Sequence, residues 1–238
     1  QPMVGHIAGK NDLNVAIATP AAQALLNADG ETPSVFTAVT DPVEAGLVES
    51  LDAPGGSMTG STDATDVEGQ IDMLLKVVPS AKTVGIFYNS SEVNSEVQAD
   101  QAKQALEAKG VKVEVATVTS TNDVQQTMTS LAAKVDAIYL PTDNTVASTA
   151  STIGEILQEA KVPAMGSDAA VIDATLFTYG VDYHAIGVQA GELAVKILKG
   201  EKPADLPVQK PNTAAVTVNE EMATALGFDA ETIKALEK

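Results

Sequence analysis

Short apolar runs and segments with helical spacing alternate along most of the chain. From residue 83 onward the apolar runs, rich in β-branched and aromatic residues, predict strands at 83–88, 111–118, 135–140 and 162–165. Between them, helices are predicted at 94–109, from Asn122 onward and at 145–160. For the second helix, Asn122 and Gln125 have the spacing of a capping box. Strands that alternate with helices are typical of a parallel sheet covered by helices on both faces.

The remaining segments repeat this order less completely. Strands are predicted at 13–18, 34–39, 58–61, 175–181 and 214–218, and helices at 21–28, 67–78 and 184–199. The segment GEKPADLPVQKP at 200–211 is rich in proline and is expected to be an exposed crossover. The chain therefore consists of two α/β halves, and we expect it to leave the second half and return to it.

Small polar residues follow most of the predicted strands. In open parallel sheets, ligands bind at the carboxyl ends of the strands. Ser, Thr, Asn and Asp in front of a helix are more often simple caps than ligand contacts, so only the set as a whole indicates a binding edge. The aromatic side chains of Tyr88 and Tyr183 also fall at strand ends, where they could stack on a ligand. The polar segments are 19–21, 40–42, 89–95, 141–144, 166–168 and 182–183.

Composition excludes several classes of function. The 238 residues carry a formal net charge of −18, which repels nucleic acid and anionic membrane surfaces. There is no cysteine, so disulfides and thiolate chemistry are excluded, and we expect neither a metal site nor a cofactor. All basic residues are lysines. A ligand carboxylate would therefore be held by Lys, hydroxyls or helix N–H groups, and the Thr19-Pro20-Ala21 segment offers such a helix start.

Two acidic residues on neighbouring predicted strands allow two interpretations. Asp143 and Asp168 could act as general acid and base, or they could bind an ammonium group. Catalysis would also need a nucleophile, a histidine or a metal, and none lies near them in the sequence. His184 begins a helix and has no evident partner, which is typical of a surface residue. We therefore predict a binding protein, with an α/β enzyme that uses Asp143 and Asp168 as the alternative.

Seven segments together resemble a known family. The segments are VAIATPAAQ, VFTAVTDPVEAGL, PGGSMTGS, AKTVGIFYN, VDAIYLPTDN, residues 180–186 and AVKILKGEKP. With them the chain resembles the solute-binding proteins of ABC importers that have the type I periplasmic-binding-protein fold, and within them the tryptophan/phenylalanine-type binding proteins. The matching segments occur in the family's order along essentially the whole chain.

The resemblance implies two Rossmann-like lobes joined by three hinge crossings. Placed on this sequence, the crossings fall near 80–82, 180–183 and 207–212. The first lobe is then expected to contain residues 1–81 and 183–208, and the second lobe residues 82–182 and 209–238.

The resemblance also implies a function. It indicates a protein that captures an amino acid, aromatic or hydrophobic, such as tryptophan or phenylalanine, in the cleft between the lobes, with closure about the hinge. The partner would be an ABC permease, and the location extracytoplasmic, as a membrane-tethered lipoprotein or a periplasmic protein. A ligand-sensing domain of the same fold is the alternative. The implied ligand-binding residues are Thr19, Ala21, Thr40, Asp41, Tyr88, Asn89, Asn94, Ser95, Asp143, Asn144, Ser167, Asp168 and Asp182.

The chain departs from the family pattern at its start. Family members have two further strand–helix units before the segment that matches 13–18, so the first lobe is expected to be incomplete at its N-terminus. Apolar residues of 13–18 and 34–39 would then be exposed, and an open strand edge attracts another strand. We therefore predict a homodimer through the first lobe.

Overall fold

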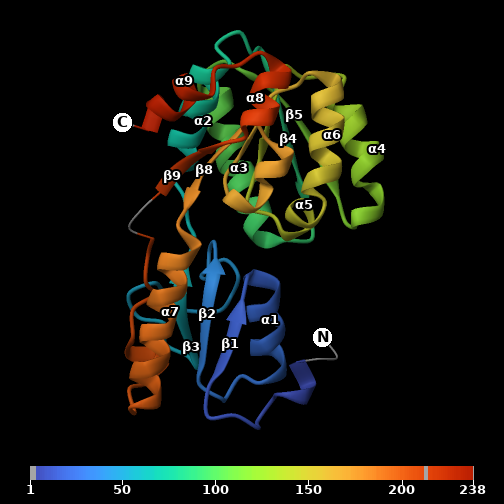
Figure 1. The fold of residues 1–238 in the computed structure, drawn as a ribbon. Helices are drawn as coiled ribbons and strands as arrows, with labels where there is room; N and C mark the ends of the chain where they lie inside the picture. The colour runs from blue at the N-terminus through green and yellow to red at the C-terminus, as the bar shows by residue number, and fades with distance from the viewer. Residues whose placement is uncertain (1–3, 212–213, 238) are drawn as a thin grey trace. The chain divides into compact units, whose positions relative to one another are not determined.

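The chain divides into two compact units in a computed structural model that describes residues 4–211 and 214–237 (Figure 1). Unit 1 comprises Gln1–Ala64 and Val181–Thr213, and unit 2 comprises Thr65–Gly180 and Ala214–Lys238. Residues 65–81 thus belong with unit 2, although the sequence places them in the first lobe. The reason is packing, because Ile71 and Leu74 are fully buried in the same apolar cluster as Val84.

A six-stranded sheet forms the centre of unit 2. The strand order is β5-β4-β6-β7-β8-β9, and the β4–β5, β4–β6, β6–β7 and β7–β8 pairs are parallel. This confirms the predicted parallel α/β architecture. The strands are β4 (Thr83–Asn89), β5 (Lys112–Val118), β6 (Ala137–Leu140), β7 (Ala164–Gly166), β8 (Phe177–Val181) and β9 (Ala214–Val218).

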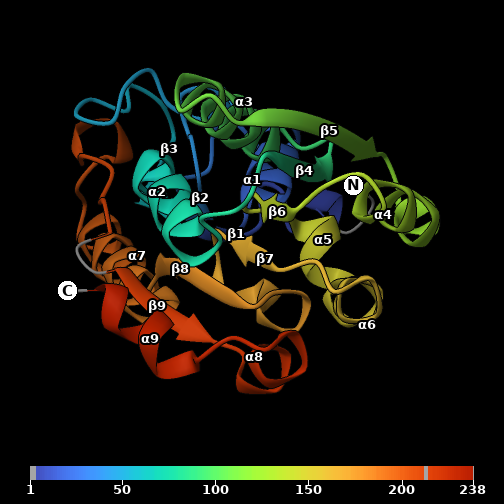
Figure 2. The ribbon, with the colours of Figure 1, turned by 90° about the horizontal axis from the view of Figure 1, so that it is seen from above.

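Helices cover both faces of this sheet, as Figure 2 shows. Successive strand residues point to opposite faces. Ile86 and Tyr139 accordingly belong to one apolar cluster, and Phe87 and Ile138 belong to the other. The helices of unit 2 are α2 (Val67–Val77), α3 (Val93–Ala108), α4 (Val124–Ala132), α5 (Asn144–Ser148), α6 (Ala150–Ala160), α8 (Glu220–Leu226) and α9 (Ala230–Lys234).

Three predicted helix details of unit 2 are wrong. The predicted helix 145–160 is two helices, which meet at Thr149. A short 3₁₀ turn occupies Thr121–Asp123, so α4 begins after it and has no side-chain cap. In α3 neither Asn94 nor Ser95 is the cap; both lie inside the first turn, because their side chains bond to the carbonyl of Thr142 instead.

Unit 1 has a smaller, parallel sheet in the order β1-β2-β3. The helix α7 (Tyr183–Leu198) packs against β2 and β3 and buries Leu193 and Ile197 with Val35. The helix α1 packs against β1 and β2. Pro20 lies in the first turn of α1, as predicted. The other elements are η1 (Val4–His6), β1 (Asn14–Ile17), α1 (Thr19–Ala28), β2 (Ser34–Val39), β3 (Met58–Thr62) and η4 (Pro203–Asp205).

The strand β1 forms an open edge of this sheet. Val15 and Ile17 are 57 % and 67 % exposed, which confirms the expectation for this strand. The same expectation for β2 is wrong: Val35 and Phe36 are fully buried, because β2 is the middle strand and has helices against it. The homodimer through the first lobe is not tested by these observations and stays a prediction.

The exposed face of β1 predicts self-association of this chain. Sedimentation velocity over a concentration series should show a larger species at high concentration, because burial of Val15 and Ile17 removes apolar surface from water. Ile17→Lys should abolish that species. Val115→Lys is the matched control, since Val115 is 46 % exposed on β5, the edge strand of the other sheet. A monomer at every concentration would contradict the prediction.

Candidate functional site

The helix α1 begins without a side-chain cap. Its N-cap residue is Ala18, whose methyl group cannot accept a hydrogen bond, and Thr19 and Pro20 follow as the first helical residues. Thr19 is buried, whereas Ala21 is exposed. The first N–H groups of a helix have no partner within the helix, and they carry the positive end of its dipole. This end of α1 can therefore receive an anionic group such as a carboxylate.

The backbone of Ala18 is strained. Its φ of 72° and ψ of 156° lie in a region that only glycine occupies easily. Strain of this kind occurs most often beside binding and active sites. The neighbouring strand shows the same feature, because Ala38 in β2 has a φ of 55°. Both residues lie at or beside the carboxyl end of their strand.

Ala18→Gly tests this strain. Because glycine adopts this conformation without a steric penalty, we expect the free energy of unfolding to rise by about 1 kcal/mol. Ala24→Gly, inside α1, is the matched control and should lower it by roughly 0.5–1 kcal/mol. Urea unfolding of both variants measures the difference. Equal losses of stability in the two variants would show that Ala18 is not strained.

Thr40 and Asp41 follow β2 and have structural contacts of their own. The carbonyl of Thr40 accepts a bond from the Thr62 hydroxyl at 3.0 Å, and one Asp41 oxygen accepts from Val43 N–H at 3.1 Å and Glu44 N–H at 3.0 Å. Both residues also line a cavity of about 450 Å³ within unit 1. Thr40 is buried, with 7 % of its surface exposed, and Asp41 is half-buried.

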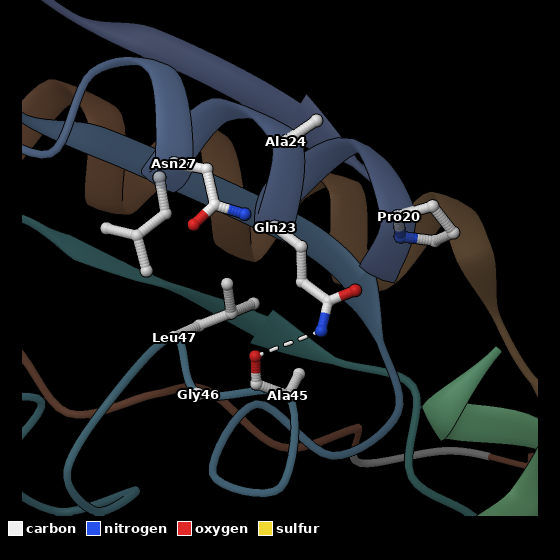
Figure 3. A pocket seen from close by; sticks show the side chains of 8 residues that line it. Pro20, Gln23, Ala24, Asn27, Ala45, Gly46 and Leu47 are labelled. Atoms are coloured by element: carbon white, nitrogen blue, oxygen red, sulfur yellow. Dashed lines mark hydrogen bonds between the residues drawn. The ribbon is translucent and has the colours of Figure 1, made fainter. Parts of the chain in front are cut away.

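A second cavity of unit 1 contains no predicted ligand residue. It measures about 550 Å³ and lies between α1 and the loop at 45–47 (Figure 3). Gln23 donates from Nε2 to the Ala45 carbonyl at 3.1 Å and so bridges the helix and the loop. Among the eight residues that line it, none is charged. A charged ligand such as an amino acid would find no counter-charge there.

Most of the predicted polar residues of unit 2 gather at one edge of its sheet. We define the carboxyl edge of unit 2 as residues 89–95, 141–145 and 166–168, which follow β4, β6 and β7. Parallel strands end on the same side, so these segments meet. The Thr142 carbonyl accepts from Asn94 Nδ2 at 2.9 Å and Ser95 Oγ at 3.1 Å, and the Thr142 hydroxyl lies 2.7 Å from Ser167 Oγ.

One acceptor at this edge has no partner. Asn94 is 2 % exposed, and among the described residues its Oδ1 receives no hydrogen bond. A buried acceptor without a donor costs free energy, and native structures rarely leave one open. Asn94 Oδ1 can therefore accept a bond from an additional donor.

Asp143 is the most buried carboxylate of the carboxyl edge, with 1 % of its surface exposed. Its Oδ2 accepts from Asn89 N–H at 2.7 Å, and its Oδ1 accepts from Val146 N–H at 2.8 Å, which caps α5. None of the ion pairs among residues 4–211 and 214–237 involves Asp143. These two N–H groups therefore stabilise its negative charge.

A second carboxylate, which the sequence did not suggest, lies beside Asp143. Glu92 is 7 % exposed and accepts four bonds: from the N–H and side-chain amide of Asn144 and from the N–H and hydroxyl of Thr145. Burial raises the pKa of Asp143 above its usual range, and the negative charge of Glu92 raises it further. An incoming cation would relieve both effects.

The raised pKa of Asp143 has a measurable effect on stability. A carboxyl group with a higher pKa in the folded state stabilises the fold fully below its ordinary pKa of 3.8, and this contribution is lost as the pH rises through the folded value. Asp143→Asn cannot ionise and should not lose this contribution. Its free energy of unfolding relative to the parent chain should therefore increase as the pH rises from 3.8 through the folded-state pKa of Asp143. Urea unfolding over acidic to neutral pH measures this.

Removal of the negative charge of Glu92 provides a second test of the raised pKa of Asp143. Glu92→Gln should lower the pKa of Asp143, which carbon-detected NMR of the carboxyl group follows directly. A titration of Asp143 at or below its ordinary value in the parent chain would contradict the assignment.

Two buried glutamines, also not predicted, connect this edge to the rest of unit 2. Gln98 Oε1 accepts from Thr142 N–H at 2.7 Å and from Ser167 Oγ at 3.2 Å. Gln70 Oε1 accepts from the Tyr139 hydroxyl at 2.7 Å, and its Nε2 donates to the Tyr179 carbonyl at 2.6 Å and to the Ser167 carbonyl at 3.4 Å. A signal for both was present, since each glutamine falls in phase with the apolar stripe of its helix.

Four predicted site residues have structural contacts of their own. Tyr88 packs in an apolar cluster of unit 2, and burial raises its pKa. Asp168 caps the 3₁₀ turn at Ala169–Ala174. Asp182 caps α7 in unit 1, where it accepts from two N–H groups. The hydroxyl of Tyr183, a further aromatic candidate, bonds to Asp63 at 3.2 Å. Asp168 and Asp182 therefore act as helix caps, the role that the sequence analysis gave as the more common one for such residues.

Neither a metal centre nor a membrane span is evident in the described part of the chain. No group of three or more His, Asp or Glu side chains there is arranged to hold a metal ion. No helix among these residues has both the length and the apolar character needed to cross a bilayer.

Comparison with solved structures defines the class of fold. Over 98 % of its length the chain superposes on a Streptococcus pneumonia ABC domain in complex with L-Trp, with a TM-score of 0.92, 39 % identity and 82 % of that chain covered. A conserved domain protein from Vibrio cholerae gives the same TM-score of 0.92 over 98 % of this chain and 81 % of its own, at 36 % identity. The fold is that of the type I periplasmic binding proteins, as predicted.

The sequence defines the family. Residues 3–233 match the ABC transporter substrate binding protein family, and the chain belongs to it. A tyrosine-binding protein of Clostridioides difficile is 37 % identical over 221 residues, which are 92 % of this chain. The chain spans 64 % of the length of that relative. The family consists of binding proteins rather than enzymes, as predicted.

Proposed function

We propose that this protein captures an aromatic amino acid outside the cytoplasm and delivers it to an ABC permease. The family supports the role of a substrate-binding component. Two relatives support the kind of ligand, since one is a tyrosine-binding protein and the other was solved with L-Trp. In this proposal the protein is a membrane-tethered lipoprotein or a periplasmic protein.

The observation that carries the proposal is a buried carboxylate without a cation. Asp143 lies at the carboxyl edge of unit 2, and no lysine is paired with it among the described residues. An α-ammonium group supplies the positive charge that this place lacks. We propose that Asp143 binds the ammonium group and that Asn94 Oδ1 accepts a second of its three protons.

The start of α1 in unit 1 is the proposed carboxylate-binding element. The chain contains no arginine, so a guanidinium fork is excluded. The uncapped N–H groups after Ala18 provide the donors and the dipole instead. The two elements are proposed separately, one in each unit, and each can be tested by its own substitution.

Calorimetry with a panel of amino acids tests the proposal. Tyrosine, tryptophan or phenylalanine should bind without chemical change, and the same compounds without the ammonium group should not. Asp143→Ala should weaken binding by about 2–5 kcal/mol, because the ammonium group loses its counter-charge.

A matched control separates binding from helix capping. Asp66→Ala removes another aspartate cap in unit 2, at the start of α2, and should leave the affinity unchanged. Equal affinities of the parent chain and Asp143→Ala would disprove the role of Asp143. Absence of binding for the whole panel would disprove the proposed ligand class.

A further inference from the structure

The side chain of Gln98 connects three separate segments of unit 2. It projects from α3 and is 1 % exposed. Its Oε1 accepts from Thr142 N–H at 2.7 Å and Ser167 Oγ at 3.2 Å, and its Nε2 donates to the Thr65 hydroxyl at 3.3 Å. Glutamine is suited to this place, because its amide both accepts and donates.

Two of these three contacts belong to the carboxyl edge, and the third does not. Thr65 is the first residue of unit 2 after the chain leaves unit 1. Gln70 makes a parallel connection, from Tyr139 inside the sheet to the carbonyl of Tyr179, which lies one residue before the end of this segment of unit 2 at Gly180. Both glutamines therefore end at a place where the chain passes between the units.

The two ends of the Gln98 amide cannot move independently. The amide group is planar, and a rotation that breaks the bond from Nε2 to Thr65 also turns Oε1 away from its donors. The Thr142 N–H is buried, so loss of its acceptor carries a desolvation cost. Asp143 is the next residue after Thr142, and the Thr142 carbonyl holds Asn94. A displacement of Thr142 therefore moves the groups proposed to bind the ammonium.

We infer that Gln98 is a positioning residue for ligand binding and that it acts only while it is bonded to Thr65. The inference rests on the proposed function, because it concerns the same edge. Neither Gln98 nor Thr65 is assigned a contact with the ligand. The affinity of the carboxyl edge for the amino acid thus depends on the hydroxyl of Thr65, which lies where the chain enters unit 2.

A pair of substitutions at Thr65 tests this dependence. Thr65→Val keeps the shape of the side chain and removes the hydroxyl, whereas Thr65→Ser keeps the hydroxyl. We expect Thr65→Val to weaken binding of the aromatic amino acid about fivefold, the effect of one lost hydrogen bond, and Thr65→Ser to match the parent chain. A purely structural role would change the unfolding temperature and leave the affinity of folded protein unchanged, so both are measured.

A double-variant cycle identifies Gln98 as the link. Gln98→Met should weaken binding at least as much as Thr65→Val, and Thr65→Val should have no further effect in the Gln98→Met background. Gln101→Met is the matched control, because Gln101 is exposed on the same helix. Additive effects of the two substitutions, or an unchanged affinity of Thr65→Val, would overturn the inference.

A measurement without ligand separates this inference from the proposed function. The amide proton of Thr142 donates to Gln98, so its NMR shift and hydrogen exchange report on the link directly. Thr65→Val should change both, and Thr65→Ser should not. If Thr65→Val alters the Thr142 amide but the chain binds no amino acid, the link from Thr65 through Gln98 to Thr142 is supported and the proposed ligand class is disproved. An unaltered Thr142 amide in Thr65→Val would disprove the link, whatever the chain binds.

Discussion

The polar groups at the carboxyl edge of unit 2 are buried, and each of them needs a partner. Where parallel strands end, their last N–H and C=O groups have no hydrogen-bond partner on the neighbouring strand, and water normally supplies these bonds. Here Asn89, Thr142 and Ser167 are buried, so side chains take that role. The Asp143 carboxylate receives the Asn89 N–H, and the Gln98 amide receives the Thr142 N–H. These bonds connect α3 and the start of α5 to the ends of β6 and β4.

The same requirement explains how an acidic chain without arginine keeps carboxylates in its interior. Asp143 and Glu92 are both buried, and backbone and side-chain donors of Asn89, Asn144, Thr145 and Val146 surround them. Such donors stabilise a negative charge and do not neutralise it. The two carboxylates are therefore fixed in place, and their negative charge favours binding of a cation. This arrangement is suited to a ligand that carries a positive group.

The sequence indicates the scaffold of this arrangement better than its polar detail. The strand β4 and the stripe of Val124, Met128 and Leu131 in α4 follow from periodicity, because apolar burial leaves a regular pattern. The predicted capping box at Asn122 was wrong, because residues Thr121–Asp123 form a 3₁₀ turn in the folded chain and the local sequence motif does not reveal it. Gln98 and Glu92 were not predicted, because their partners lie 44 and 52 residues away along the chain.

The helix α5 shows what this dependence means for the order of folding. It has five residues, Asn144–Ser148, and a helix this short does not persist alone in water. Its first turn is held by the carboxylates of Asp143 and Glu92, and Glu92 comes from the turn before α3. We therefore expect this segment to become helical only together with β4, α3 and β6, which position the groups that hold its first turn.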